Sequence, residues 1–496
     1  MVKKIIQSFL FGLIFSQCIA QNQGITNNWL MGYYGGYGVT KIDFFSGAPV
    51  VDSFPIPMEF NHTHSNISDS MGNLLFYTNG YYIADASNDT MQNGSGINPS
   101  TYTSYFSDGL GIPQANIILP SPGIPNFYYL IHSTVDKYPG YTCSYDLYYS
   151  VIDMNLNGGL GAVTGVKNQI LLSDSMNPGK ISACRHANGR DWWIMCHRLN
   201  SDIFYSFLLS PNGIDGPYFQ NMGIIRGYDG GQAVFSHDGS RYAYYHVFDG
   251  LEVFDFDRCA GLLSNPQLVN VPLNGGFNVG MAISGNSKVL YVPNVYDVLQ
   301  YDLTSSNISS TAQIVAVYDS FTSYIGSAPP LQTLFGLAAL APDGKIYIST
   351  GNSTVHLHVI NQPDSVGLSC DLVQHGLQLP TYAFNTFPNH PNYFLGKIPG
   401  SPCDTIPLNT SIDEFPERIL KVSPNPTSDE FTIWFSVQDK PGIVEIFDVN
   451  GTMVRKDYIV EWSQYKKLNI SNLPNGLYFS RMSWNKKIVQ VKIIKH

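Results

Sequence analysis

The stretch Ser236-His-Asp-Gly-Ser-Arg-Tyr-Ala-Tyr-Tyr245 joins an Asp-Gly turn to an aromatic strand, and the chain repeats this pattern. Gly suits the turn because a tight hairpin needs positive φ, and alternating apolar side chains suit a strand. Two close copies are Asp69-Ser-Met-Gly-Asn-Leu-Leu-Phe-Tyr-Thr78 and Ala341-Pro-Asp-Gly-Lys-Ile-Tyr-Ile-Ser349. Weaker copies are His186-Ala-Asn-Gly-Arg-Asp-Trp-Trp-Ile-Met195, Ser284-Gly-Asn-Ser-Lys-Val-Leu-Tyr-Val292 and Ser121-Pro-Gly-Ile-Pro-Asn-Phe-Tyr-Tyr-Leu130.

The spacing of these turns predicts a ring of similar units. Successive glycines of the pattern are 46 to 66 residues apart: Gly72, Gly123, Gly189, Gly239, Gly285 and Gly344. A strand-rich unit of this length, repeated around an axis, is a β-propeller blade. Residues 29–55 offer further strands, and residues 382–396 could complete or close the ring. We predict seven blades, with six or eight as alternatives; stacked sandwiches, the rival arrangement, would give less regular spacing.

The composition favours an all-β protein. The chain has 496 residues, with 32 Tyr, 28 Phe, 45 Gly and 30 Pro, and only 13% are charged, against about 25% on average. Many aromatics and turn formers suit short antiparallel strands. Long helices would need periodic runs rich in Ala, Glu, Lys and Leu, and the sequence contains none.

The balance of charge changes sign near residue 418. Residues 21–417 hold 13 basic and 30 acidic groups, a net charge of −17, whereas residues 418–496 hold 12 and 7, a net charge of +5. Such a change marks a domain boundary, and the acidic body argues against nucleic acid and anionic lipid as main partners. We predict a signal peptide, a propeller domain, a linker and a terminal β-sandwich, with the boundaries 1–20, 21–397, 398–417 and 418–496.

The N-terminus has the pattern of a secretory signal. Lys3 and Lys4 precede a short apolar run, and Cys18-Ile19-Ala20 supplies small residues for cleavage between Ala20 and Gln21. The alternative, a lipid on Cys18, is disfavoured because Gln17 stands where a small residue is wanted. No later segment approaches the roughly 20 continuous apolar residues that a membrane helix needs.

Cleavage would leave six cysteines, an even number that permits disulfides in an exported chain, with fifteen pairings open. We expect a Cys370–Cys403 bond because both residues flank the end of the main domain. The two-residue hairpin loop between Cys184 and Cys196 sets Cys184 opposite Trp193, so a Cys184–Cys196 bond would need another register. The chain has no Cys-x-x-Cys pair, which argues against a zinc or thioredoxin-like site.

Four motifs follow one another in the final segment: Val422-Ser-Pro-Asn-Pro-Thr427, Val444-Glu-Ile-Phe-Asp-Val-Asn-Gly451, Leu468-Asn-Ile-Ser-Asn-Leu-Pro-Asn-Gly-Leu-Tyr478 and Lys487-Ile-Val-Gln-Val-Lys-Ile-Ile-Lys495. In this order the segment resembles the type A C-terminal sorting domain of type IX secretion cargo in Bacteroidetes. The matching motif residues are Pro424, Asn425, Pro426, Asn450, Gly451, Asn475, Gly476, Leu477 and Tyr478. The resemblance implies an immunoglobulin-like sandwich and the type IX machinery as a partner. It also implies a place on the outer-membrane surface or in the medium, reached through the periplasm.

The main domain resembles a propeller-like domain that is common in exported proteins of the same bacteria. The residues that carry this resemblance are Ser65-Asn-Ile-Ser-Asp-Ser-Met-Gly-Asn-Leu-Leu-Phe-Tyr-Thr-Asn-Gly80, Val151-Ile-Asp-Met-Asn-Leu-Asn-Gly-Gly-Leu-Gly161 and Ala341-Pro-Asp-Gly-Lys-Ile-Tyr347. It implies no activity and no cofactor.

Several residue groups have the types that catalysis or metal binding uses. The pairs His62/His64 and His356/His358 would each share one face of a strand and could bind a metal, although no third ligand can be named. The aspartates 249, 255 and 257 lack the calcium-loop pattern and are expected in blade loops. Ser236-His237-Asp238 holds the residue types of a catalytic triad, but neighbours in a turn cannot reach its geometry.

Two features favour binding to an extracellular ligand. Trp192 and Trp193 would point to opposite faces of a strand, so one could reach the surface and stack on a glycan. Residues 81–113, rich in Ser, Asn, Gly and Tyr, have the composition of a recognition loop. We therefore favour binding or adhesion without a cofactor or metal. The alternative is a secreted glycosidase or lyase that uses carboxylates in the propeller channel.

Overall fold

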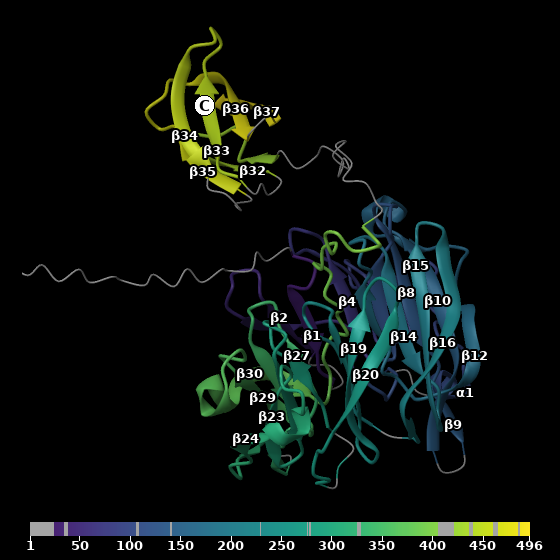
Figure 1. The fold of residues 1–496 in the computed structure, drawn as a ribbon. Helices are drawn as coiled ribbons and strands as arrows, with labels where there is room; N and C mark the ends of the chain where they lie inside the picture. Colours follow the sequence, from purple (N-terminus) through teal and green to yellow (C-terminus); the bar gives the residue numbers. More distant parts are fainter. Residues whose placement is uncertain are drawn as a thin grey trace, which may run out of the picture. The chain divides into compact units, whose positions relative to one another are not determined.

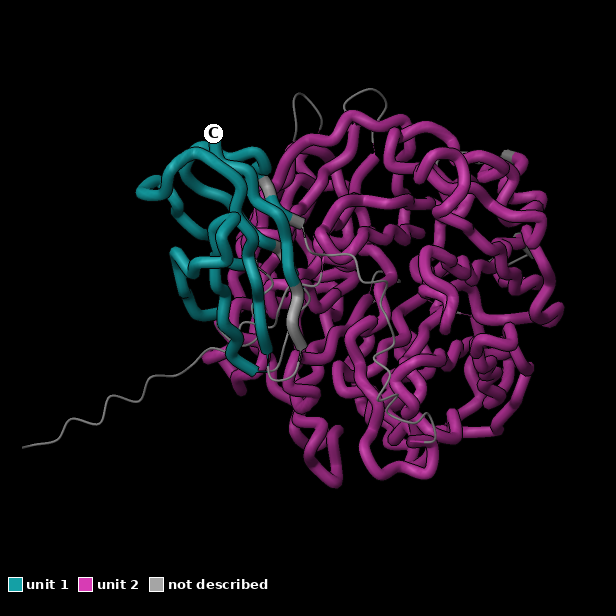
Figure 2. The backbone as a smooth tube through the Cα atoms, turned by 90° about the horizontal axis from the view of Figure 1, so that it is seen from above, with its two compact units in different colours: residues 1–21, 406–496 teal, residues 22–405 magenta. Residues whose placement is uncertain are grey.

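The structure is a computed structural model. It describes residues 24–33, 38–105, 109–138, 141–228, 230–274, 276, 279–324, 329–404, 421–435, 440–459, 465–484 and 487–496. The expected signal peptide with Ala20 and Gln21, and most of the expected linker, lie outside these residues. The described chain divides into two compact units, residues 22–405 and residues 406–496, drawn in magenta and teal in Figure 2.

The first unit is built from seven antiparallel sheets that follow one another along the chain, together with one two-stranded hairpin (Figure 1). The first three sheets are β1 (Asn28–Met31), β2 (Val39–Asp43) and β3 (Val50–Phe54); β4 (Ser65–Ser68), β5 (Leu74–Thr78) and β6 (Ile83–Asp85); and β7 (Asn116–Pro120), β8 (Phe127–Ser133), β9 (Asp136–Tyr138), β10 (Tyr141–Asp153), β11 (Ala162–Val163) and β12 (Gln169–Met176). A short helix α1 (Thr101–Tyr105) precedes β7.

The other four sheets each have four strands in sequence order. They are β13 (Ser182–Arg185), β14 (Trp192–His197), β15 (Ser201–Ser210) and β16 (Gly213–Arg226); β17 (Ala233–Phe235), β18 (Arg241–His246), β19 (Gly250–Asp257) and β20 (Leu262–Val269); β21 (Ala282–Ile283), β22 (Val289–Asn294), β23 (Asp297–Asp302) and β24 (Gln313–Val317); and β27 (Ala338–Leu340), β28 (Ile346–Ser349), β29 (Thr354–Ile360) and β30 (Leu372–Ala383). The hairpin is β25 (Thr322–Ser323) with β26 (Leu331–Gln332).

Contacts between successive sheets close these elements into a ring. The first strands of neighbouring sheets touch in the pairs β1–β4, β4–β7, β13–β17, β17–β21 and β21–β27. The third and fourth sheets meet through β12 and β16, and β2 and β3 lie against β30 of the last sheet. Figure 2 views this unit from above, with its sheets set around a centre. Each predicted turn-and-strand repeat falls on one sheet of the ring. The prediction of a seven-bladed propeller is therefore confirmed.

The apolar cores lie between blades, because each sheet packs a face against its neighbour. One cluster joins the first and last blades, where the ring of Trp29 meets Phe44 (5.1 Å between centroids) and Tyr347 (5.8 Å). Another joins the fourth and fifth blades and includes Trp193 and Phe254. Radial packing of this kind explains how so many strands avoid long exposed edges.

The stretch 81–113, which we expected to be a recognition loop, contributes one strand and several buried side chains to the propeller. Its first residues form β6, and Gln92 forms an isolated bridge with Ala162 next to β10. Met91, Ile97 and Leu110 are buried. Replacing the stretch would therefore remove core, so the recognition argument built on it is abandoned.

The second unit is a small immunoglobulin-like sandwich. One sheet contains β31 (Lys421–Ser423), β32 (Glu430–Trp434) and β35 (Tyr465–Asn469), and the other contains β34 (Met453–Ile459), β33 (Gly442–Phe447), β36 (Gly476–Trp484) and β37 (Lys487–Lys495). Alternating residues of both sheets, such as Ile433, Ile446 and Met482, form its core. This agrees with the predicted terminal sandwich. Among the described residues, no helix is both long and apolar enough to cross a membrane.

Candidate functional site

The inside of the ring is occupied by the chain itself. After β30, residues 384–398 run past the first strands of several blades, and we call them the axial segment. The backbone N–H of Asn389 donates to the carbonyl of His64, just before β4 (3.0 Å). The Asn389 amide donates to the carbonyls of Asn116 in β7 (2.9 Å) and Ile181 before β13 (2.8 Å). The axial segment thus ties the second, third and fourth blades together from within.

Two glutamine side chains also reach from blade to blade. Gln114 accepts from the N–H of Ala233 and donates to its carbonyl (both 2.8 Å), which links the third blade to the fifth. Gln232 accepts from the N–H groups of Met281 (2.9 Å) and Ala338 (3.0 Å) and donates to the Ala338 carbonyl (3.2 Å). These bonds satisfy backbone groups at the inner ends of three blades.

Substitution of Gln232 tests this arrangement. Gln232→Leu leaves two buried N–H groups and one carbonyl without partners, and each such group costs about 1–3 kcal/mol. We expect the free energy of unfolding to fall by about 3 kcal/mol, measured by urea denaturation. Gln169→Leu, on the exposed edge strand β12, is the control and should change little. A Gln232→Leu protein as stable as the wild type would show that the bridge is dispensable.

Two imidazoles also belong to this interior, one in the axial segment and one beside it. Burial lowers the pKa of His390 to about 4 and holds the pKa of His64 well below its usual range, so both imidazoles are neutral at pH 7. His390 donates from Nε2 to the carbonyl of Asn66 (2.7 Å). The interior side chains described above are amides and imidazoles, whereas the enzyme alternative required two facing carboxylates.

Two arginines hold the axial segment where it leaves the ring. Arg185 donates to the carbonyl of Tyr393 (3.1 Å), and Arg258 donates to the carbonyl of Gly396 (2.7 Å). The N–H of Ile398 then donates to the carbonyl of Ala187 (2.8 Å). Residues 398–404, assigned to the linker from the sequence, therefore lie against the propeller unit.

A disulfide closes this exit. It joins Cys403 to Cys259, in the turn between β19 and β20, with 5.6 Å between the Cα atoms and 144 residues between them in sequence. The expected Cys370–Cys403 bond is wrong, since Cys370 is a buried free thiol. The physical reason is that Cys370 lies in the seventh blade, whereas the axial segment carries Cys403 to the fifth.

The other free cysteines belong to the cores. Cys184 lies opposite Trp193, as the two-residue hairpin loop predicted, and neither Cys184 nor Cys196 is bonded. Burial raises the pKa of both thiols to about 12 and that of Cys143 to about 11. These thiols are therefore protonated and unreactive at neutral pH.

The second histidine pair has hydrogen-bond partners, whereas neither ring nitrogen of His64 has one among the described residues. His356 Nδ1 of β29 bonds the Ser323 hydroxyl in β25 (2.9 Å), and His358 donates to the Leu334 carbonyl after β26 (2.9 Å). His64 is buried beside Phe60. Within the described ranges, no group of three or more His, Cys, Asp or Glu side chains could hold a metal ion.

The tryptophan pair does not reach the surface. Trp192 and Trp193 are both buried, and their indole N–H groups donate to the carbonyls of Pro120 (3.2 Å) and Arg258 (2.9 Å). The expected outward tryptophan is wrong because the β20 side of the fifth blade covers it: a Cβ on Gly261 would lie 2.7 Å from the Trp193 ring.

The carboxylates noted in the sequence stabilise loops. Asp249 accepts from the Gly227 N–H (2.9 Å), and Asp255 pairs with Arg241 (2.7 Å). Asp257 accepts from the Cys259 N–H (2.7 Å). In the Ser236-His237-Asp238 turn the Ser236 hydroxyl donates to Asp238 (2.6 Å), which is a local turn contact. Asp249 thus lies in a loop as expected, whereas the expectation is wrong for Asp255 and Asp257, which belong to strand β19.

One end of the propeller carries exposed aromatic side chains, and we call it the aromatic end. Tyr228 and Phe248 lie in adjoining connections, because His246 donates to the Gly227 carbonyl (2.8 Å). Tyr296 lies beside the connection that carries Tyr324, because the Tyr318 N–H donates to the Tyr296 carbonyl (2.9 Å). Tyr228 and Tyr324 lie between successive blades, whereas Phe248 and Tyr296 lie in the β18–β19 and β22–β23 turns within the fifth and sixth blades.

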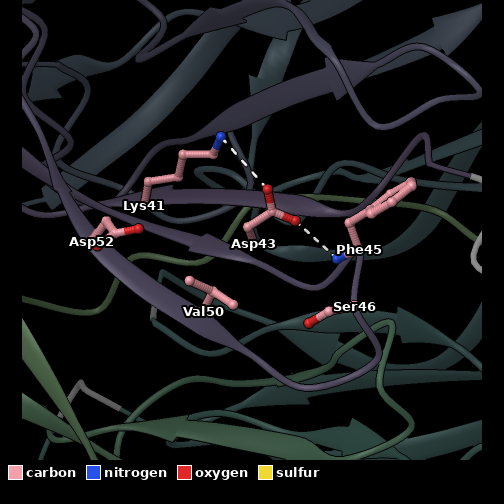
Figure 3. Close-up of a pocket in the computed structure, with 6 residues that line it drawn as sticks. All are labelled: Lys41, Asp43, Phe45, Ser46, Val50 and Asp52. Carbon is pink, nitrogen blue, oxygen red and sulfur yellow. Dashed lines mark hydrogen bonds and ion pairs between the residues drawn. The ribbon is translucent and has the colours of Figure 1, made fainter. Parts of the chain in front are cut away.

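A shallow groove of about 230 Å³ lies elsewhere, on the β2–β3 hairpin of the first blade. Figure 3 shows the residues that line it: Lys41, Asp43, Phe45, Ser46, Val50 and Asp52. The Lys41 ammonium lies 3.7 Å from the Asp43 carboxylate. Asp43 also accepts from the Phe45 N–H (2.8 Å).

The sorting-motif residues organise the second unit. Asn425 donates to the Lys492 carbonyl (2.8 Å) and accepts from the Ile494 N–H (2.9 Å), which fastens the first motif, with Pro424 and Pro426, to the last strand. Asn450 and Gly451 form the β33–β34 turn, and Asn475 precedes Gly476 and Leu477 at the start of β36. Tyr478 is buried and donates to the Pro474 carbonyl (2.6 Å).

Lys495 bonds the last strand, β37, to the segment before β36. Its buried ammonium donates to the carbonyls of Ile470 (2.7 Å), Ser471 (3.0 Å) and Leu473 (2.6 Å). We expect Lys495→Met to destabilise the unit by about 3 kcal/mol, since bonds to charged groups contribute about 1.5–3 kcal/mol each. Limited proteolysis of the full chain should then cut the tail faster. Lys492→Met, exposed on the same strand, is the control; equal cleavage rates would contradict the role.

The fold and the tail together define an exported propeller with a C-terminal sorting domain. Residues 421–496 match the family described as the secretion system C-terminal sorting domain. The protein is thus cargo of the type IX secretion system, and its tail directs it to the cell surface or the medium. No curated protein matches the chain.

The solved structures described below resemble the chain only weakly, with sequence identities of 10–12% and TM-scores below 0.4. A Bacteroides fragilis protein with the provisional name 6-phosphogluconolactonase is 11% identical, covers 74% of this chain and 98% of its own, and has a TM-score of 0.39. A quinonprotein alcohol dehydrogenase-like protein from Bacteroides thetaiotaomicron is 12% identical, with a TM-score of 0.37. The match covers 74% of this chain and 77% of that protein. The Dos1 propeller is 10% identical, with a TM-score of 0.36, and the match covers 65% of this chain and 72% of that one. Similarity at this level carries no function to this chain.

Proposed function

We propose that the protein is a non-catalytic propeller that binds an extracellular ligand at its aromatic end, as an adhesin or capture protein. The observation that carries the proposal is the filled interior. The axial segment and the amides of Gln114 and Gln232 bond the inner ends of the blades, where the enzyme alternative would place its carboxylates. Exposed aromatic side chains at the aromatic end offer rigid contact area instead.

The export route agrees with this role. We propose that residues 1–20 are a signal peptide removed before Gln21, and that the source is a member of the Bacteroidetes. A protein delivered to the surface by its sorting domain meets ligands outside the cell, and surface loops are the parts of a fold that change most readily to suit them.

The full exported chain should bind in a screen of glycans, extracellular matrix proteins and whole cells. A variant with Tyr228, Phe248, Tyr296 and Tyr324 all changed to Ser should lose that binding and keep the wild-type melting temperature. Phe219→Ala, on an outer strand, is the control because Phe219 is 72% exposed. Undiminished binding by the four-residue variant, or a wild type that binds nothing, would overturn the proposal.

A further inference from the structure

The groove on the β2–β3 hairpin is lined by charged, polar and apolar side chains. Lys41 and Asp43 of β2 and Asp52 of β3 lie on one face, because Lys41 is paired with Asp52, and Asp43 with Val50, in the strand register. Figure 3 shows these side chains around the same opening, with Phe45 and Ser46 at its rim. The groove therefore presents an ammonium donor, two carboxylate acceptors, a hydroxyl and an aromatic ring.

The aromatic ring is held rigidly although it is exposed. Phe45 is 54% exposed, whereas its neighbour Phe44 is fully buried against Trp29. The bond from the Phe45 N–H to Asp43 fixes the backbone at this point. A Cβ on Gly72, in the next blade's turn, would lie 3.2 Å from the Phe45 ring, so that turn supports one side of it. A fixed, exposed ring loses little entropy when a ligand stacks on it.

The charges of the groove discriminate between ligand classes. Asp52 has no hydrogen bond or ion pair within the described chain, whereas Asp43 is already bonded to Lys41 and Phe45. Lys41 and Asp43 neutralise each other, so the groove keeps a net charge of −1 at Asp52, which disfavours an anionic ligand. A neutral polyol has both donors and acceptors, and its apolar C–H face can stack on a ring. We propose that this groove binds one neutral sugar residue of a glycan chain.

The size of the groove supports a single-residue site. Pockets for drug-sized ligands measure about 300–1,000 Å³, and this groove is smaller, at about 230 Å³. Such a site binds weakly on its own, so useful retention comes from a repeated glycan presented at high density. The site is independent of the aromatic end, and neither requires the other.

The test uses the full exported chain on an array of neutral, acidic and amino glycans, followed by titration with the methyl glycoside of the best neutral terminal sugar. We expect Phe45→Ala and Asp52→Asn each to weaken binding about tenfold, which is about 1.4 kcal/mol. Val50→Arg, which fills the groove, should abolish it. Phe219→Ala is the matched exposed control and should bind as the wild type.

Each result decides the question. Neutral-glycan binding that survives all three groove variants places the sugar elsewhere and overturns the inference, and so does binding confined to acidic glycans or to amino glycans. Loss of neutral-glycan binding in the groove variants, with unchanged matrix or cell binding, supports the groove and leaves the aromatic end standing. Binding lost only in the four-residue variant of the aromatic end supports the proposed function and refutes the groove.

Discussion

Deletion of residues 413–496 is expected to stop export and to leave a folded propeller in the periplasm. The reason is that the sorting domain is a separate compact unit with its own core, while the propeller closes on itself through the axial segment and the disulfide, which ends at Cys403. Cell fractionation should find the truncated chain inside and the wild type outside or at the surface. Protease resistance of the periplasmic form would show that it is folded.

The control for this deletion is a full-length chain with Lys492→Met, which alters an exposed residue of the last strand and should be exported normally. Appearance of the truncated chain at the surface in wild-type amount would contradict the sorting role of the tail. Degradation of the truncated chain would instead contradict the independence of the propeller unit.

Replacing both Cys259 and Cys403 by Ser should lower the free energy of unfolding of the propeller by about 4 kcal/mol, because the bond constrains a long loop in the unfolded chain. The two cysteines are 144 residues apart, and the stabilisation by a disulfide increases with the length of the loop that it closes. Urea denaturation under non-reducing conditions measures the change.

Reduction provides the matched comparison. Dithiothreitol should bring the wild type close to the double variant and leave the double variant unchanged, because its remaining described cysteines are free and buried. A wild type that is equally stable before and after reduction would show that the bond adds nothing to the stability of the ring.

The blades were predictable because their signals are local. A turn such as 238–239 sets the register of the hairpin around it, and the aromatic strand that follows it is decided by its own residues. For the same reason the opposition of Cys184 and Trp193 followed from a two-residue loop. Sorting-motif residues such as Asn425 could be found because they occur in a compact segment with fixed spacing.

The interior and the disulfide could not be predicted because they depend on closure of the whole ring. Gln114 and Ala233, or Asn389 and Asn116, lie far apart in sequence, and their meeting depends on how many blades separate them. No local pattern distinguishes these amides from exposed ones. Cys259 became the partner of Cys403 only because the axial segment crosses the ring. The exposure of Phe45 was missed for a different reason. Phe44 turns inward into the core, so its neighbour Phe45 points outward, and the sequence does not show which of the two is buried.

The Cys259–Cys403 bond also decides where mechanical force enters the molecule. A pull on the tail reaches Cys403 first and passes through the two sulfur atoms to the β19–β20 turn of the fifth blade. Residues 384–402 then carry none of the tension, so the hydrogen bonds of Asn389 are not peeled apart one after another. The disulfide therefore transfers a force applied to the tail to the whole fifth blade. The axial segment stays in place inside the ring under that force.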